Sequence, residues 1–287
     1  MKGFYMAQFT NQAQLTYRDT VTNSNVAFGE IVDALSITKT ALTSTYGAGD
    51  TIAYIISILN SGITSLTGLT LTDNLGEYSF DTGSLVPLNY TQGSLKYYIN
   101  GILQPTPQIT DADNLTITGI NIPAGENALL VYETNVNNFA PLSEGSTITN
   151  TATLTGAGIT TVTAEETVTA SVAPFLSITK SISPVPVSEN GTVTYTFLIQ
   201  NTGNTAVLAT DNAFITDLFN PILSNVTATF NGVSWTQGTE FNYNEATGLF
   251  ESVAGNITVD AASFTQGADG SWSINPGTSV LVITGTI

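Results

Sequence analysis

Hydrophobic and polar residues alternate along most of this chain in short runs. The alternation is plain in LSITK (35–39), TITNTATLTG (147–156) and TVTYTFLIQN (192–201), and the side chains of a strand point alternately to its two faces. Threonine, valine, isoleucine and tyrosine, which favour strands, dominate these runs. We find no segment that combines a 3.6-residue period with helix caps. The pattern therefore predicts an all-β protein built from many short strands.

Turn signals separate the runs at short intervals. Asn100-Gly101 and Asn231-Gly232 each lie between two apolar runs, and Asn-Gly at such a place favours a two-residue hairpin. Short strands joined by frequent turns are typical of immunoglobulin-like β-sandwiches.

Two parts of the chain repeat each other. LSITK occurs at 35–39 and again at 176–180. At equal distances after it come a tyrosine (Tyr54 and Tyr195) and an Asn-x-Gly motif (Asn60 and Asn201). An apolar run that ends in Thr-Asp follows in both, at Asp73 and Asp217. The repeat predicts two tandem Ig-like modules, at 34–157 and 176–287, with an extended segment between them at 158–175.

The two modules end differently. Module one continues into a strand at 147–156, whereas module two stops before the equivalent strand. A segment that resembles the missing strand stands at the start of the chain, because 9–39 aligns with 148–180 across a two-residue gap. We therefore interpret 1–33 as an N-terminal donor-strand arm. Its inward residues are Phe9, Asn11, Ala13, Leu15 and Tyr17.

A sandwich without its last strand exposes unpaired backbone groups and core side chains. The arm of one molecule can complete module two of the next by donor-strand addition. This contact is heterologous and need not close, so it predicts an open head-to-tail homopolymer. In the alternative interpretation, the arm folds back on its own chain, closing module two or pairing along module one.

Composition removes most other classes of function. The chain has 287 residues with 22 acidic and 5 basic side chains, and it has no histidine or cysteine. Nucleophilic systems that need histidine or cysteine are excluded, as are disulfides and the usual zinc, haem and iron–sulfur sites. A net charge of −17 makes nucleic acid a poor partner. No apolar run is long enough for a transmembrane helix. We expect no enzyme activity, no cofactor, no bound metal and no membrane insertion.

Two of the few lysines fall on strand faces that should be buried. Lys39 shares its face with Leu35 and Ile37. The same test of strand alternation turns Asn150 and Asp73 inward in module one. By the repeat, the equivalent set in module two is Lys180 and Asp217, with Asn11 supplied by the arm.

A buried Lys–Asn–acid triplet suits a spontaneous isopeptide bond. Burial lowers the pKa of a lysine and raises the pKa of a carboxylic acid, giving a neutral amine and a protonated acid. The acid can then shuttle protons as the amine attacks the asparagine amide. We expect Lys39 to bond to Asn150, assisted by Asp73 or, as a rival acid, by Glu133. Between molecules, we expect Lys180 to bond to Asn11 of the neighbour, assisted by Asp217.

A simpler interpretation stays open for each of these residues. Lys39 and Lys180 stand at the ends of apolar runs, from which a long side chain can extend to water. Asp73 and Asp217 fit turns at strand ends, and Asn150 fits a loop cap.

The motifs LSITKT and LSITKS, Tyr-x5-Asn-x-Gly, LTLTD, PAG and TNTATLT resemble the bacterial conserved repeat domain of unknown function, an Ig-like module of Gram-positive surface proteins. The whole chain is similar to proteins of spore-forming Firmicutes. The resemblance implies a fibre subunit at the cell or spore surface, pilus-like or an endospore appendage, with an anchor or cap protein that stays unknown. No Sec signal is visible in the sequence. A monomeric adhesin or stalk module is the alternative, and an enzyme acting on polysaccharide is a distant third.

Overall fold

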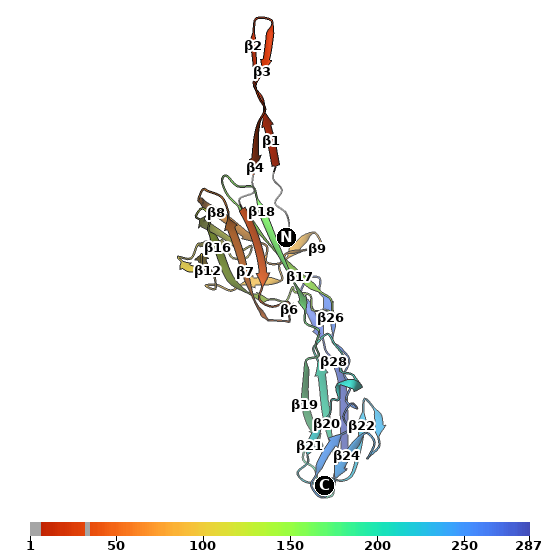
Figure 1. Cartoon of the computed structure of the whole chain (residues 1–287). Coiled ribbons are helices and arrows are strands. Elements are labelled where there is room, and N and C mark those ends of the chain that lie inside the picture. Colours follow the sequence, from red (N-terminus) through yellow and green to blue (C-terminus); the bar gives the residue numbers. More distant parts are fainter. Residues whose placement is uncertain (1–6, 32–34) are drawn as a thin grey trace.

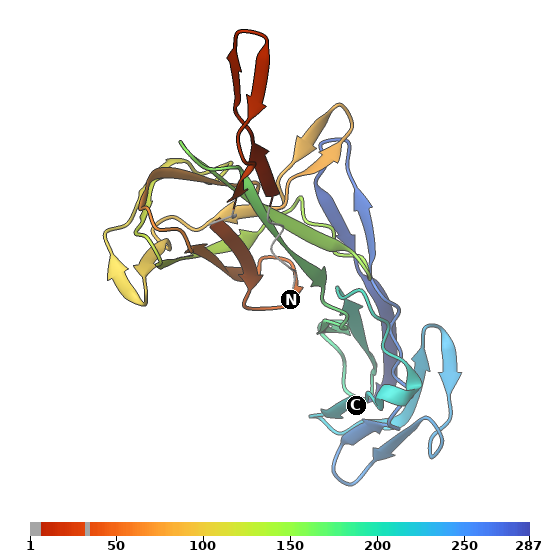
Figure 2. The ribbon, with the colours of Figure 1, turned by 45° about the horizontal axis from the view of Figure 1, so that its top comes forward.

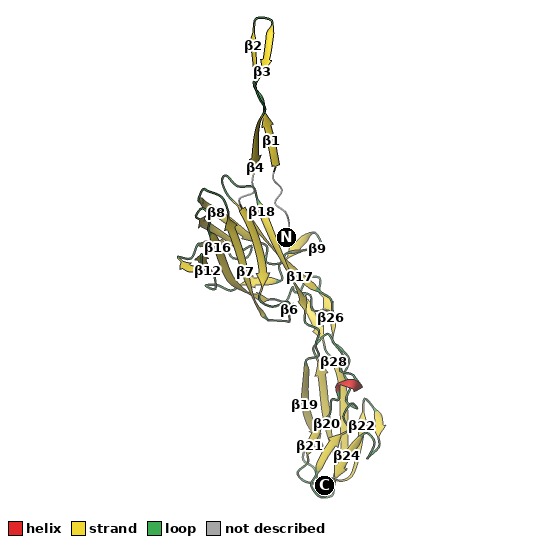
Figure 3. Ribbon diagram, in the orientation of Figure 1, coloured by secondary structure: helices red, strands yellow, loops and turns green. Residues whose placement is uncertain are grey.

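The computed structural model describes residues 7–31 and 35–287. Almost all of its regular structure is strand, and the described residues contain a single helical turn, η1 (Ala209–Asp211) (Figure 3). The predicted all-β class is confirmed. Both Asn-Gly pairs form the predicted hairpins, because Asn100 and Asn231 each take a positive φ and each is followed by a glycine with positive φ.

The first sandwich consists of two sheets with one core between them. One sheet runs β13 (Ile102–Gln104), β12 (Lys96–Ile99), β16 (Asn127–Val136), β7 (Thr51–Asn60) and β5 (Leu35–Ala41), with β11 (Leu88–Tyr90) also on β16. The other runs β14 (Gln108–Asp111), β15 (Thr116–Ile122), β8 (Leu66–Asp73), β17 (Thr147–Thr155), β18 (Val162–Ala170) and β6 (Thr45–Tyr46). A hairpin of β9 (Tyr78–Phe80) and β10 (Gly83–Leu85) lies outside the two sheets.

The position of β18 differs from our expectation for 158–175. We predicted an extended segment between modules, but β18 pairs with β17 along its length and buries Val168 and Ala170. It belongs to the first sandwich because its alternate residues cover that core. The part of 158–175 that joins the two sandwiches is therefore shorter than predicted.

The second sandwich has its own core cluster. Its large sheet runs β19 (Leu176–Ser183), β20 (Thr192–Asn201), β28 (Gly277–Thr286), β22 (Ser224–Phe230) and β23 (Val233–Trp235). In the described part of the chain, the facing sheet consists of β21 (Thr216–Leu218), β25 (Leu249–Ser252) and β24 (Phe241–Asn244). A hairpin of β26 (Ser263–Gln266) and β27 (Trp272–Asn275) reaches back to the first sandwich, where the Trp272 backbone N–H donates to the Asn138 carbonyl oxygen at 2.8 Å.

The arm is a hairpin rather than one extended strand. β1 (Ala7–Asn11) pairs with β4 (Ala27–Ile31), and β2 (Gln14–Tyr17) pairs with β3 (Thr20–Asn23). The returning strands supply hydrogen-bond partners that a lone strand would lack. Figures 1 and 2 place this hairpin beyond one end of the first sandwich, and Figure 1 places the C-terminus at the far end of the second.

Candidate functional site

A polar cluster lies inside the core of the first sandwich. Lys39 enters it from β5, Asp73 from the end of β8 and Asn150 from β17, and all three are buried. Strand alternation explains the inward direction of Lys39, because Thr38 and Thr40 on either side of it are exposed. Lys39 does not extend to water, since its side chain is 0% exposed.

Asp73 is the hub of this cluster. Its Oδ2 accepts a hydrogen bond from Lys39 Nζ at 2.5 Å and another from the Tyr132 hydroxyl. Its Oδ1 accepts the backbone N–H of Leu75 at 3.0 Å, as in an Asx turn. Asp73 is therefore a turn residue and also the partner of the buried lysine.

The pairing of β8 with β17 fixes Asn150 beside Asp73. Ala152 lies directly opposite Asp73, and Asn150 is two residues away on the same inward face. The neighbouring residue Thr151 is held on both sides, because its N–H donates to Asn74 Oδ1 at 2.8 Å and its carbonyl accepts the Asn74 N–H at 3.0 Å. The amide of Asn150 is thus held in the wall of the cluster by backbone pairing.

The side-chain amide of Asn150 is buried without a hydrogen bond of ordinary geometry to either its nitrogen or its oxygen. It lies close enough to the hydroxyls of Tyr54 and Tyr132 to oppose part of the rise in their pKa. A buried amide without partners costs about 1–3 kcal/mol, so such a group calls for an explanation. Bond formation with Lys39 would provide one.

Burial sets the charge state of the cluster. It lowers the pKa of Lys39 from 10.5 to about 8, although the negative charge of Asp73, its hydrogen bond and the charge of Glu166 oppose the shift. Burial also raises the pKa of Tyr132 well above its ordinary value, helped by the neighbouring charge of Asp73. The tyrosine therefore remains a hydrogen-bond donor while the lysine is unusually easy to neutralise.

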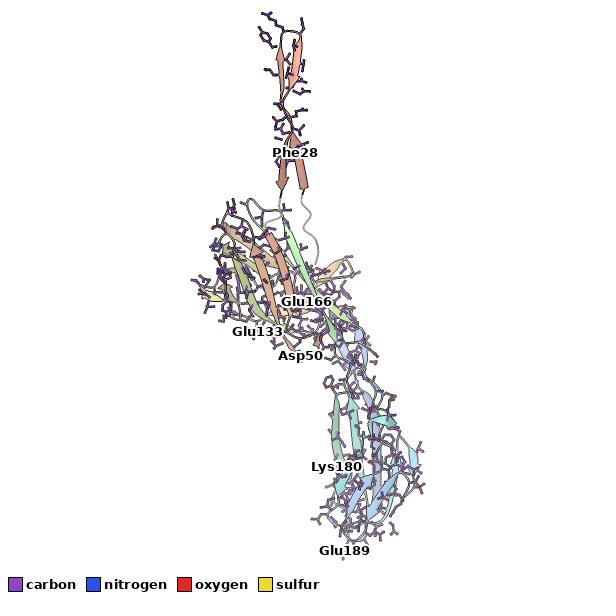
Figure 4. All side chains as sticks on the ribbon, viewed as in Figure 1. Phe28, Asp50, Glu133, Glu166, Lys180 and Glu189 are labelled. Atoms are coloured by element: carbon purple, nitrogen blue, oxygen red, sulfur yellow. The ribbon has the colours of Figure 1, made fainter. Side chains whose placement is uncertain are left out.

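Tyr132 is a member of the cluster that sequence reasoning missed. That reasoning turned Glu133 inward as a rival acid, and this is wrong. The buried residues of β16 are Ala128, Leu130, Tyr132, Thr134 and Val136, so Glu133 lies on the opposite face and points to solvent (Figure 4). The sequence offered one sign of it, a tyrosine within an apolar run. In the structure Tyr132 lies opposite Tyr54 across the β7–β16 pair and stacks on it, with ring centroids 5.8 Å apart.

The second sandwich holds a similar but open cluster. Lys180 forms an ion pair with Asp217, yet the lysine side chain is 38% exposed and the aspartate side chain 17% exposed. The lysine nitrogen lies 4.6 Å from the ring centre of Tyr195 and 5.0 Å from that of Phe219, distances typical of cation–π contacts. Figure 4 shows Lys180 on the second sandwich, well away from the arm.

The structure does not bring Asn11 to Lys180 within one chain. Asn11 ends β1 in the arm, and the described apolar side chains around it face solvent: Phe9 is 54% exposed, Leu15 69% and Tyr17 65%. Among the described residues, the strands of the arm pair only with one another, so within one chain the arm neither closes the second sandwich nor pairs along the first. A bond between Asn11 and Lys180 therefore requires two molecules.

No family model and no curated protein matches the chain, so the resemblance to the bacterial repeat domain rests on sequence motifs. The chain is similar to the solved structure of BcpA, the major pilin subunit of Bacillus cereus, at 14% identity and a TM-score of 0.35, over 94% of this chain and 73% of that one. The chain is also similar to the pilus backbone (RrgB) from Streptococcus pneumoniae, at 10% identity and a TM-score of 0.34, over 84% of this chain and 55% of that one. A third similar structure is the collagen-binding domain from a Staphylococcus aureus adhesin, at 16% identity and a TM-score of 0.30, over 46% of this chain and 96% of that one. Because these TM-scores are low, the function proposed below rests on this chain's own residues.

Within 7–31 and 35–287, no helix has the length and apolar character needed to cross a membrane. In the same residues, no group of three or more acidic side chains is placed to hold a metal ion.

The low pKa of Lys39 predicts a pH dependence in the variant Asn150→Ala, which leaves the amine unbonded. From pH 7 to 9.5 the unfolded chain binds more protons than the folded one, because Lys39 titrates at about 8 when folded and at 10.5 when unfolded. The free energy of unfolding should therefore rise by about 2 kcal/mol over this range. Urea unfolding at several pH values measures the rise. The double variant Lys39→Met/Asn150→Ala should lose it, and an equal rise in both variants would contradict the assignment.

Proposed function

We propose that this chain is the structural subunit of an extracellular bacterial fibre, pilus-like or a spore appendage. Its subunits join head to tail when the arm of one molecule completes the second sandwich of the next. The observation that carries the proposal is the position of two unpartnered parts at opposite ends of the molecule (Figure 1). One is an arm with exposed apolar side chains, and the other is a sandwich with an exposed edge strand, β19.

Both the arm and β19 expose large apolar side chains to water, which is unfavourable. Phe9, Leu15, Tyr17 and Phe28 expose large apolar side chains on an isolated hairpin, which has little stability on its own. Along β19, Leu176 and Ile178 are also exposed. Burial of one such side chain stabilises by about 1.5–3 kcal/mol, so mutual burial of the two parts favours association.

Lys39 and Asn150 supply a covalent lock within each subunit. In the reactive form the shared proton lies on Asp73 and Lys39 Nζ is a neutral amine. The nitrogen attacks Asn150 Cγ, and the new Nζ–Cγ bond forms as the Cγ–Nδ2 bond breaks. Asp73 gives its proton to the leaving nitrogen and takes one from the attacking nitrogen, so that one ammonia departs. Tyr132 holds Asp73 in place through its hydrogen bond.

Between subunits, Lys180 forms the corresponding isopeptide bond with Asn11 of the neighbouring arm, and Asp217 is the assisting acid. The partner of each subunit is then another copy of the same chain. An anchor or cap protein at the fibre base or tip is required in addition, and the chain itself performs no catalysis on other molecules.

Negative-stain electron microscopy of the purified full chain tests this function. We expect open filaments from the full chain and monomers from a chain that lacks residues 1–31, because the arm is the only connection proposed between subunits. Ile102→Lys, at an exposed apolar position on β13, serves as the control and should still form filaments. Filaments from the truncated chain would contradict the proposal. A full chain that stays monomeric at high concentration would instead favour a surface adhesin or stalk module.

A further inference from the structure

The first sandwich contains a template for the contact between subunits. There β17 pairs with β8, and β18 pairs with β17 and lies beside β5 at the edge of the opposite sheet. The β17–β18 hairpin therefore extends one sheet beyond β8 and also covers β5 at the edge of the opposite sheet.

Among the described residues, no strand takes either of these positions in the second sandwich. Its β21 corresponds to β8 by the repeat, and among the described residues β21 pairs with β25 alone. Its β19 corresponds to β5, and every residue of β19 is exposed. The empty space therefore has the width of two strands, one beside β21 and one covering β19.

The arm has the form that fills this space. It is an antiparallel hairpin whose outgoing strands carry FTNQAQLT (9–16), where β17 carries ITNTATLT (148–155). We propose that the arm inserts as an intact hairpin into the second sandwich of a second copy, with β1 and β2 beside β21 and β3 and β4 covering β19. This inference rests on the proposed function and adds which strands meet and in which register.

The template fixes the register. In the first sandwich Ala152 lies opposite Asp73 and Thr153 opposite Thr72. The matched residues are Ala13 opposite Asp217 and Gln14 opposite Thr216. Asn11 then lies two residues from Ala13 on the inward face, next to Asp217 and Lys180, as Asn150 lies beside Asp73 and Lys39. A shift by one residue would turn Asn11 away from the lysine.

The same placement accounts for the arm's direction. The tip of the hairpin points away from its own first sandwich, and the second sandwich ends at the opposite end of the molecule (Figures 1 and 2). A second copy placed beyond that end can insert its arm and continue the row. The junction between subunits then repeats the junction between the two sandwiches of one chain.

Disulfide trapping tests the register, and the chain is suited to it because it has no cysteine. Gln14→Cys and Thr216→Cys are made in separate chains, at two exposed positions, and the chains are mixed under mild oxidation. Directly opposite residues of an antiparallel pair are about 4.5–5.5 Å apart between Cα atoms, within reach of a disulfide. We expect a mixed disulfide dimer on a non-reducing gel. The matched control, Thr16→Cys mixed with Thr216→Cys, moves the cysteine two residues along the strand and should give at least tenfold less dimer.

The possible outcomes separate the inference from the proposed function. Equal dimer from both mixtures, or no dimer from either while uncrosslinked chains form filaments, would overturn the register and leave the fibre standing. The double variant Gln14→Cys/Thr216→Cys in one chain should give a ladder of oligomers. If it gives only an internally bridged monomer, the arm closes its own sandwich and the inference is wrong. Absence of filaments from the cysteine-free chain would count against the proposed function itself.

Discussion

Substitution of Lys39 by methionine should restore one ammonia to the intact mass of the chain and lower its stability strongly. The native chain should weigh one ammonia less than its sequence, because Lys39 Nζ replaces Nδ2 on Asn150. The bond closes a loop of roughly 110 residues, and loss of such a cross-link costs about 4–5 kcal/mol in the chain-entropy account. Lys39→Met also removes the Nζ–H group that donates to the buried Asp73 carboxyl, which adds to the loss.

Two further variants separate these contributions. Asn150→Ala removes the bond but leaves Lys39 as a free amine that can pair with Asp73, so its loss of stability should be smaller than that of Lys39→Met. Lys96→Met changes an exposed lysine on β12 and should leave both the ammonia deficit and the melting temperature unchanged. Mass spectrometry and thermal unfolding provide the measurements. A native mass equal to the plain sequence would exclude the intramolecular bond.

Removal of the bond between Lys180 and Asn11 of the neighbouring subunit should convert a covalent fibre into a dissociable one. We expect the native fibre to give a ladder of oligomers on a denaturing gel after boiling. Lys180→Met and Asn11→Ala should each reduce the ladder to monomer, because each removes one partner of the bond between subunits. Filaments should still form in both variants at room temperature, since donor-hairpin contacts do not need the bond.

A mixture of these two variants gives a sharper result. Asn11 of a Lys180→Met chain can bond to Lys180 of an Asn11→Ala chain, but neither chain can then extend the bonding. The mixture should therefore restore a boiling-resistant dimer and nothing larger. A ladder in either single variant would show that other residues form the link. The absence of dimer from the mixture, together with a ladder from the native chain, would exclude this pairing.

The sequence was sufficient for part of the buried cluster. Alternation along a strand depends only on local geometry, so the inward direction of Lys39 and Asn150 could be read from their apolar neighbours. Tyr132 and Glu133 show where this reasoning fails. The run NALLVYET has apolar residues at successive positions, so its alternation can be read in either phase. Only the packing of its sheet against the opposite sheet decides which face is buried.

The exposure of Lys180 shows a second limit. Its local sequence, LSITK, is the same as that around Lys39, yet one lysine is buried and the other reaches solvent. The difference arises from strands far away in the sequence. β17 and β18 cover the first cluster, and nothing among the described residues takes their place over the second.

The sequence by itself determined the strand-rich class, the Asn-Gly hairpins, the repeat and the similarity of the arm to the end of module one. These features depend on side-chain alternation, turn chemistry and spacing, which are local. Only the tertiary structure decided that the arm is a hairpin, that β18 belongs to the first sandwich, that Tyr132 joins Asp73 and that β19 is uncovered. Each of these depends on which strands pair across long separations in the chain, and the free energy of that pairing comes from the burial of whole faces rather than from any local signal.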